Sequence, residues 1–456
     1  MTTYIDPIAD YAHALRYEDL SADAIRHVKR CLIDTFGVAL GAFDEEPCQI
    51  ARKLAQRVSV PTGARILGTP HRTLPELAAF ANSTMARYFD GNDVYPGGGG
   101  HPSDMMGGIL AVADQNKVNG KTLITAVVLA YEVYYSLWQA THMRLKGMDN
   151  VFYTTVGSAV GAAKVLGFDR ARMAETIALA VAPNVAMDAT RYGRLSMWKG
   201  TAGGNAARNG VFAALLAEAG MTGPELALQG KHGLENLTGA FELAPLATGG
   251  QPFRITEISI KVFLSEGHSL SPITAALQLC KEVAADDIAS VTIDTYQFAK
   301  DIIGTGPEKW RPVTREDADH SMPYIVAAVL IDRAFSDAIF SSERRCDPRV
   351  LQLADKITIN EDPALTQQAS EKLPCRITLK TKSGATKVVS VDYPRGHTLN
   401  PMSDDEMSDK FRGLARRVLP EARVNQALDA LWKLDTAANL DAIYDAVQLN
   451  RQRNIY

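Results

Sequence analysis

The hydrophobic pattern of this 456-residue chain changes its period near the middle and changes back near the end, and this constrains the fold more than any single motif. Up to about residue 245, apolar residues recur at helical spacing, as at Ile25, Val28 and Leu32. Residues 246–255, LATGGQPFRI, then combine paired glycines with a proline, which is typical of a boundary. The first part of the chain is therefore predicted to be a helical domain.

The segment beyond that boundary alternates apolar and polar residues, as strands do. Residues 291–294 and 357–360 show this alternation, and residues 375–392 have the pattern of a hairpin with its turn near Gly384. Helical patterns interleave with these strands. Residues 256–401 are therefore predicted to form an α+β domain.

The C-terminal segment returns to helical spacing. Ser403 and Glu406 have the spacing of a capping box, in which each side chain accepts a hydrogen bond from the other residue's backbone at a helix start. We expect residues 402–456 to pack on the first domain. The predicted fold is mainly α, with a large all-α domain formed by both chain ends, residues 1–255 and 402–456, and a smaller α+β lid domain.

Composition excludes several classes of protein. Hydrophobic residues make up 46% and charged residues 22%, which excludes a mainly disordered chain. The formal net charge is −4, so there is no basic excess for binding nucleic acid. No uncharged apolar run reaches the ~18 residues of a membrane span, since residues 123–138 are interrupted by Glu132. The N-terminal sequence lacks the pattern of a signal peptide, so we expect a cytoplasmic protein without membrane or nucleic-acid partners.

Motifs for common cofactors and metals are absent from the sequence. The five cysteines are scattered without a CxxC pair, and the nine histidines occur singly, without ligand spacing. There is no glycine-rich dinucleotide fingerprint after a strand, no P-loop, and no HExxH or GxSxG motif. We therefore predict chemistry by side chains alone, with no cofactor and no metal.

The first chemical cluster lies around a run of four glycines, residues 97–100. Asp90 and Asp93 precede this run, and His101 and Ser103 follow it. Glycine lets the backbone approach a ligand closely, and a histidine near carboxylates can carry protons at neutral pH. The alternative interpretation is a flexible turn with surface charges.

Two lysines and a second histidine form further clusters. Lys199 follows a segment that contains Arg191 and precedes a glycine-rich stretch, so its ammonium group could pair with a carboxylate ligand. Lys261 and His268 are seven residues apart where the helical domain gives way to the α+β domain, and ligand sites favour such interfaces. The alternatives are an ordinary lysine at a helix start, a solvated charge and a capping histidine.

A fourth cluster runs from Asp319 through His320 to Tyr324. Pro323 fits the first position of a helix, and the Tyr324 hydroxyl could donate a hydrogen bond to a developing charge. By itself, such a segment is more often a helix start than a catalytic site. A fifth segment, residues 394–397, is more typical of structure than of catalysis.

Taken in order, these segments resemble the MmgE/PrpD family, in the branch that contains 2-methylcitrate dehydratases. The resemblance rests on motifs in register over most of the chain: HVKRCLIDTFGVAL, FDGND, GHPSD, LSMWKGTAGGNAARNG, KWRPVTREDADHSMPY and YPRGHTLNPMSDDEM. It implies a helical domain built from both chain ends, an α+β lid, a homodimer, and a metal-free site in the cleft between the domains. The catalytic residues that it implies are Asp90, His101, Lys199, His268 and Tyr324. The predicted substrate-binding residues are Lys261, Asp93, Ser103 and Arg191.

The substrates that the resemblance implies are small di- or tricarboxylates. Removing a proton next to a carboxylate builds negative charge, which the two lysines would neutralise without a metal. Loss of water also needs a base and an acid, and we expect His101, oriented by Asp90, to act with His268 or Tyr324. The expected activity is that of a cofactor-independent lyase dehydrating 2-methylcitrate or a related hydroxy-polycarboxylate. The alternatives are decarboxylation of an acid such as cis-aconitate, epimerisation on the same scaffold, and carboxylate binding without catalysis.

Three positions depart from the family pattern. Val94 stands where relatives carry a threonine, and Asn150 stands where relatives of this branch often carry a histidine. The proline usual near Leu264 is absent. Because the first two changes remove polar groups, we expect weak activity on 2-methylcitrate and better activity on an acid with fewer or differently placed oxygens.

Overall fold

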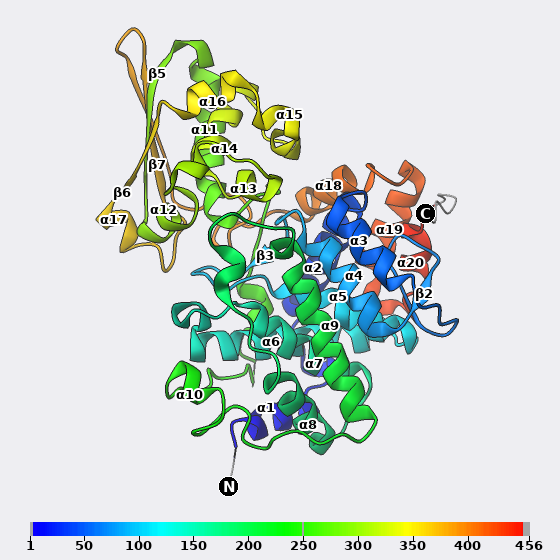
Figure 1. Cartoon of the computed structure of the whole chain (residues 1–456). Coiled ribbons are helices and arrows are strands. Elements are labelled where there is room, and N and C mark those ends of the chain that lie inside the picture. The colour runs from blue at the N-terminus through cyan, green and yellow to red at the C-terminus, as the bar shows by residue number, and fades with distance from the viewer. Residues whose placement is uncertain (1–2, 249, 450–456) are drawn as a thin grey trace.

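The computed structural model describes residues 3–248 and 250–449 and confirms the predicted mainly α fold. Figure 1 shows a large helical part and a smaller part, at upper left, that contains the largest sheet. The helices of the large part are α1 (Ile5–Ala14), α2 (Ala22–Gly41), α3 (Glu46–Ala55), α4 (Pro75–Arg87), α5 (Met106–Gln115), α6 (Gly120–Thr141), α7 (Val151–Val165), α8 (Arg170–Val181), α9 (Trp198–Glu218), α10 (Glu235–Thr238), α18 (Asp404–Ala415), α19 (Glu421–Trp432) and α20 (Asp441–Val447).

The two largest apolar cores fall on these two parts. One core draws on residues 5–264 and 402–449, and the other on residues 273–391. We propose the division predicted from sequence, and we call residues 256–401 the lid and the remainder the body. The lid contains α11 (Leu270–Glu282), α12 (Gln297–Ile303), α13 (Arg315–Asp319), α14 (Met322–Asp332), α15 (Ser342–Arg345), α16 (Pro348–Ala354), α17 (Pro363–Thr366), β5 (Ile288–Thr295), β6 (Ile357–Glu361), β7 (Cys375–Thr381) and β8 (Thr386–Val391).

Helix α6 is central to the body because its residues are apolar on nearly all sides. Every residue from Leu123 to Tyr134 is buried. Helix α7 packs against α6, and small residues in α7 let α5 approach closely, since a Cβ at Gly161 would lie 2.5 Å from the Ile109 side chain. Among the described residues, no helix is both long and apolar enough to cross a membrane.

The C-terminal helices lie against the N-terminal ones, so that α18 packs on α2 (Figure 1). The contact is close because a Cβ at Gly37 would lie 3.2 Å from the Phe411 Cα. Helix α18 begins with the predicted capping box. The Ser403 Oγ accepts a hydrogen bond from the Glu406 amide at 3.2 Å, and the Glu406 carboxylate accepts one from the Ser403 amide at 2.6 Å.

The lid sheet has the strand order β6-β5-β7-β8, and each strand predicted from alternation is present. Strands β5 and β6 are parallel, with Val291 opposite Ile357, while β5–β7 and β7–β8 are antiparallel. In β5 the apolar residues Val291 and Ile293 are buried, which is what the alternating pattern requires of a strand with one covered face. Helices α11 and α14 supply the apolar side chains of this second core.

A two-stranded ribbon joins the body to the lid. Strand β3 (Asp93–Val94) pairs antiparallel with β4 (Ser259–Ile260), and the Ile260 amide donates a hydrogen bond to the Gly396 carbonyl at 2.9 Å. The loop that carries Asp90, the entry to the lid and the exit from it therefore meet at one place.

Candidate active site

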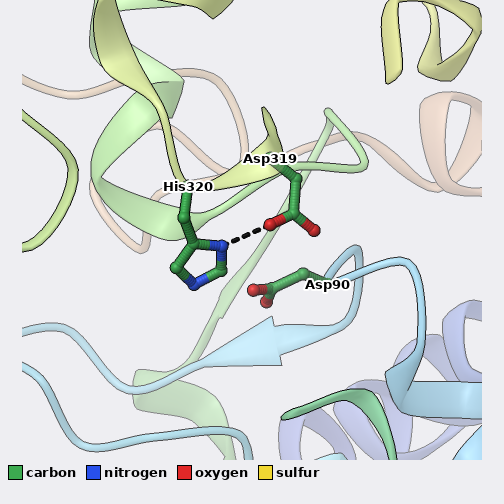
Figure 2. Close-up of side chains that lie close together, drawn as sticks. All are labelled: Asp90, Asp319 and His320. Atoms are coloured by element: carbon green, nitrogen blue, oxygen red, sulfur yellow. Dashed lines mark hydrogen bonds and ion pairs between the residues drawn. The ribbon is translucent and has the colours of Figure 1, made fainter. Parts of the chain in front are cut away.

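Two carboxylates and an imidazole gather where the body meets the lid (Figure 2). Asp90 comes from the loop after α4, whereas Asp319 and His320 come from the end of α13. One oxygen or nitrogen atom of each side chain lies within 4.8 Å of the other two. Asp90 has a φ of 51°, a left-handed conformation that is uncommon outside glycine and that often marks a functional loop.

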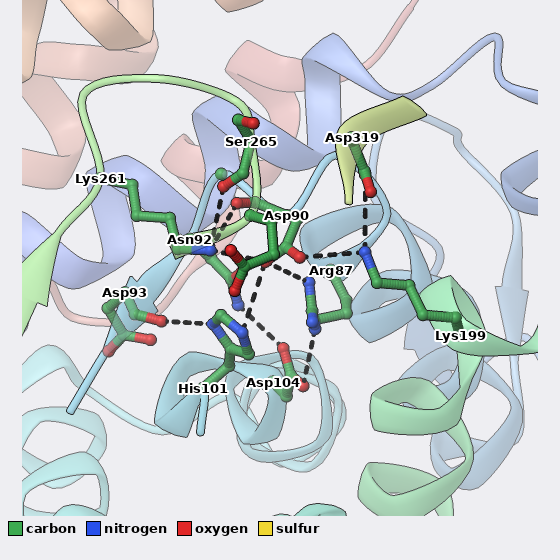
Figure 3. A network of polar contacts seen from close by, with 12 residues as sticks. Arg87, Asp90, Asn92, Asp93, His101, Asp104, Lys199, Lys261, Ser265 and Asp319 are labelled. Carbon is green, nitrogen blue, oxygen red and sulfur yellow. Dashed lines mark hydrogen bonds and ion pairs between the residues drawn. The ribbon is translucent and has the colours of Figure 1, made fainter. Parts of the chain in front are cut away.

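Three cations surround the Asp90 carboxylate (Figure 3). Arg87 Nη1 lies 2.8 Å from one oxygen, Lys261 Nζ lies 2.6 Å from the same oxygen, and Lys199 Nζ lies 2.9 Å from the other. Burial alone would raise the pKa of Asp90, but Arg87, Lys199 and Lys261 together hold that pKa well below its usual range. Asp90 is therefore ionised, and its charge is more than compensated.

The two lysines are placed by their helix and strand ends. Lys199 lies in the first turn of α9, and its Nζ also lies 3.5 Å from Asp319. Lys261 follows β4, and its Nζ also donates to the carbonyls of Asp90 and Ser265 at 2.8 and 3.2 Å. Each lysine is about 1% exposed, and neither is among the residues that line the cavity described below. Both ammonium groups thus bind protein carboxylates, where sequence reasoning expected them to bind substrate.

The same three side chains, Asp90, Asp319 and His320, are the group of potential metal ligands that the described residues offer. Lys199 Nζ lies between the two carboxylates, at the place where a divalent ion would bridge them. Arg87 adds a further cation. A metal ion would have to displace Lys199 and would face repulsion from Arg87, so the charges of this group are suited to an anion.

His101 follows the glycine run, and the main chain fixes its tautomer. Its Nδ1 lies 2.7 Å from the Asp93 carbonyl oxygen, which can only accept, so Nδ1 carries the hydrogen and Nε2 a lone pair. Nε2 lies 3.4 Å from the Asp90 carboxylate. Burial, together with Arg87 and Lys261, holds the pKa of His101 well below its usual value. The imidazole is therefore a neutral base. The Asp93 carbonyl orients it, rather than the Asp90 carboxylate that we had expected in this role.

A cavity between the body and the lid lies beside these groups. Three imidazoles line it, those of His101, His268 and His320. Arg144 and Arg191 line it as well. Arg191 Nε lies 3.0 Å from Asp149, and Arg144 Nε lies 3.4 Å from Asp188. His268 and Arg191 are thus found where the sequence predicted a ligand.

Besides Lys199 and Lys261, three more of the predicted site residues do not line this cavity. The Tyr324 hydroxyl donates to the Ile339 carbonyl inside the lid core, so Tyr324 is not positioned to meet a substrate. Asp93 and Ser103 bind each other, because the Ser103 amide donates to Asp93 Oδ1 at 2.9 Å. Tyr131 donates to the other Asp93 oxygen at 2.6 Å. Asp93 and Ser103 therefore shape the loop that holds His101.

Three residues at the site were missed or undervalued by sequence reasoning. Arg87 ends α4 three residues before Asp90, so a salt bridge at this spacing was a usable signal. His320 was noticed only as a neighbour of Tyr324. Arg144 gave no signal, since it lies in a 3₁₀ turn after α6 with no motif around it.

Two family models match most of this chain. The MmgE/PrpD N-terminal domain matches residues 6–242, and the MmgE/PrpD C-terminal domain matches residues 263–434. The chain belongs to the MmgE/PrpD family. It is 30% identical to the 2-methylcitrate dehydratase of Cupriavidus necator, over 98% of this chain and 96% of that protein. It is 28% identical to the Escherichia coli 2-methylcitrate dehydratase, over 92% of each chain, and 27% identical to the mitochondrial 2-methylcitrate dehydratase of Yarrowia lipolytica, over 93% and 86%.

Val94 and Asn150, the two positions that we expect to differ in this member of the MmgE/PrpD family, line the cavity. Asn150 Nδ2 donates to the Gly98 carbonyl at 2.9 Å, so the amide holds the glycine run in place. A Cβ at Gly100 would lie 2.9 Å from the Asn150 side chain, which shows how close the two segments are. Val94 is half-buried in β3 opposite Ser259. The Val94 and Asn150 side chains thus face the space where a substrate would lie.

Proposed function

We propose that this protein is a metal-independent hydro-lyase that dehydrates 2-methylcitrate or a related hydroxy-polycarboxylate. The relatives named 2-methylcitrate dehydratase support the reaction class, because the similarity extends over nearly the whole chain. The observation that carries the proposal is the neutral base His101, which faces a cavity that also contains Arg144 and Arg191.

The arginines suit a substrate with more than one carboxylate. Each is paired with one carboxylate of the protein, Asp188 for Arg144 and Asp149 for Arg191. A guanidinium has five N–H donors, so an arginine held by one partner keeps donors for a second. We propose that the substrate carboxylates bind to these two arginines.

His101 is the proposed base. Its Nε2 lone pair would take a proton from the carbon next to a substrate carboxylate, and negative charge would develop on that carboxylate. The buried carboxylates of this cluster are Asp90, Asp104 and Asp319. The cations paired with them exceed them by one, and these are Arg87, Lys199, Lys261 and Arg315. This fixed excess of positive charge would stabilise the developing anion without a metal.

Departure of the hydroxyl group needs a proton donor. The electron pair of the broken C–H bond forms the double bond, the C–O bond breaks, and the oxygen takes a proton and leaves as water. Of the two donors expected from sequence, His268 lines the cavity and Tyr324 does not. Proton donation is therefore proposed to come from an imidazole.

We also propose that the protein is a cytoplasmic homodimer, as the family resemblance implies. Val185, Met187 and Trp198 are exposed on one surface of the body and line the same shallow pocket. Exposed apolar side chains that gather in this way are typical of interfaces. Sedimentation equilibrium should give twice the chain mass, and Trp198→Lys should shift the protein towards monomer. A monomer at micromolar concentration would contradict the proposal.

The test of the function is a panel of hydroxy-di- and tricarboxylates incubated with the purified protein. Alkene absorbance reports dehydration, released CO₂ reports decarboxylation, and proton NMR reports epimerisation. Alkene formation without CO₂ supports the proposal. CO₂ or an epimer without alkene would contradict dehydration and indicate decarboxylation or epimerisation instead. Binding without turnover would identify a non-catalytic homologue.

Chelation tests the metal-free part separately. Dialysis against EDTA should leave the rate of dehydration unchanged, because Lys199 supplies the cation between Asp90 and Asp319. Loss of activity that a divalent ion restores would contradict this part of the proposal.

A further inference from the structure

His320 lines the same cavity as His101. It follows α13, comes from the lid, and is 6% exposed. Its Nδ1 contacts the Asp319 carboxylate, while its Nε2 makes no hydrogen bond with any described residue (Figure 2). The ring therefore has one nitrogen held by a carboxylate and the other available to a molecule in the cavity.

Asp319 is ionised, so it can only accept from this ring. Burial alone would raise the pKa of Asp319, but Lys199, His320 and Arg315 lower it to about 2. Burial and Lys199 lower the pKa of His320 in the empty cavity, and the Asp319 carboxylate opposes them. A carboxylate on Nδ1 also fixes the tautomer of a histidine, as in other proton-transferring pairs of this kind. A polyanionic substrate bound in the cavity would raise the pKa of His320 and so favour the protonated ring.

Asp90 lies close to both His320 and His101. Nε2 of His101 lies 3.4 Å from the Asp90 carboxylate, and an imidazole nitrogen of His320 lies within 4.8 Å of the same group. Elimination of water needs a base at one carbon and an acid at the adjacent one. The two imidazoles line one cavity and lie close to the same carboxylate, one from the body and one from the lid, so a substrate in the cavity can meet both.

His268 has a weaker claim to the same role. Its Nδ1 contacts the neutral Tyr296 hydroxyl, and burial raises the pKa of that hydroxyl further. Its Nε2 lies 3.8 Å from the Glu266 carboxylate, which would compete with a substrate for the proton. A neutral phenol stabilises an imidazolium less than a carboxylate does.

We propose that His320, held by Asp319, is the catalytic acid that protonates the departing hydroxyl, with His101 as the base. His101 Nε2 gains the proton of the substrate C–H bond, and that electron pair becomes the double bond. The C–O bond breaks, and the oxygen takes the proton of His320 Nε2 and leaves as water. Exchange with solvent then returns both rings to their starting states. This assignment rests on the proposed dehydration.

The test compares two leaving groups. Fluoride leaves without protonation, so an analogue with fluorine in place of the substrate hydroxyl needs His101 but no acid. His320→Gln should lose about 10²–10⁴-fold in kcat on the hydroxy acid. On the fluoro analogue it should remain within about tenfold of the unmodified protein, while His101→Asn should fail on both.

His268→Gln is the matched control, and it should lose activity on both substrates alike. Equal loss on both substrates for His320→Gln, or no loss on either, would overturn the assignment. If His320→Gln does not fold, Asp319→Asn tests the same idea, since it should slow only the hydroxy acid. Turnover of the unmodified protein separates the two claims, because a protein that dehydrates nothing contradicts the function itself.

Discussion

Two charge clusters in this molecule are opposite in sign: cations outnumber the central carboxylate in one, and carboxylates outnumber the central cation in the other. Around Asp90, one carboxylate has three cations, those of Arg87, Lys199 and Lys261. Around Arg65, one guanidinium has three carboxylates at 2.5 to 3.1 Å, those of Asp114, Asp441 and Asp445. The first cluster joins the body to the lid beside the cavity, whereas the second joins the N-terminal helices to α20 and touches no residue that lines the cavity.

Their surroundings explain why only the first is suited to chemistry. The Asp441 and Asp445 side chains are 41% and 70% exposed, so water neutralises the negative excess around Arg65. The Asp90 side chain is 3% exposed, and each of its cation partners is buried still more deeply. A buried excess of charge that water does not screen costs stability, and a bound anion relieves that cost. We therefore infer that the Arg65 cluster stabilises the fold and that the Asp90 cluster prepares the site for an anion.

The largest effect on folding is expected at Arg65. Arg65→Met removes the closest cation from the buried Asp114 carboxylate and leaves the more distant Arg72 and Lys117 and the main-chain amide of residue 65. We expect the free energy of unfolding to fall by about 3–5 kcal/mol. Activity per folded molecule should stay the same. Urea unfolding and kcat/KM at low temperature measure the two quantities. Arg26→Met is the control, because it removes an exposed salt bridge. If folded Arg65→Met loses activity, the Arg65 cluster is not purely structural.

Changes to the two lysines of the Asp90 cluster should lower activity more than they lower stability. Lys199→Ala and Lys261→Ala should each lower kcat/KM by about 2–4 kcal/mol of transition-state stabilisation, because the positive excess is lost. Lys164→Ala is the control, since Lys164 is a partly buried lysine that binds only main-chain carbonyls far from the cavity. Near-normal kcat/KM in both site variants would show that this cluster has no role in the reaction.

The acid limb of the pH profile should report the depressed pKa of His101. A base must be neutral, and burial with Arg87 keeps this imidazole neutral as the pH falls through 6.5. We expect kcat/KM to hold at pH 6.5 and to fall only at lower pH. Burial raises the pKa of the neighbouring Asp104 to about 7, so Asp104→Asn must be profiled beside it. Half of the activity lost at pH 6.5 or above in both proteins would contradict a depressed pKa.

The smallest effect concerns Val94 and Asn150, the two cavity positions expected to depart from the family pattern. Val94→Thr combined with Asn150→His should raise dehydration of 2-methylcitrate, by roughly tenfold or ~1.4 kcal/mol. The physical reason is that both side chains line the cavity, where the family resemblance implies a threonine and a histidine. The unmodified protein could already turn over 2-methylcitrate at about 10 per second, near the enzyme median. That result would show that these two positions do not limit the reaction.

Much of the fold was predictable because its signals are local. The strands of the lid follow from alternation over a few residues, and the start of α18 follows from the capping box at Ser403. The sequence also drew attention to Asp90, His101 and His268, because each stands in a dense polar segment, and all three line the cavity.

The partners of those residues could not be predicted, because they are distant in the chain. Lys199 and Lys261 reach Asp90 across 109 and 171 residues, and no local pattern tells whether an ammonium meets a substrate or a protein carboxylate. Tyr324 was wrongly placed at the site for a related reason. Its position in a helix start was correct, but the direction of its hydroxyl depends on the packing of the whole lid.

The most direct test of this account is His101→Asn, measured for turnover and for binding in the same preparation. The variant keeps an amide near the Asp93 carbonyl but has no group that takes up a proton at neutral pH. We predict that calorimetry will show a tricarboxylate binding with nearly unchanged affinity, while kcat falls by about 10²–10⁴-fold. Turnover that survives the change would contradict the central claim that His101 is the base of this site.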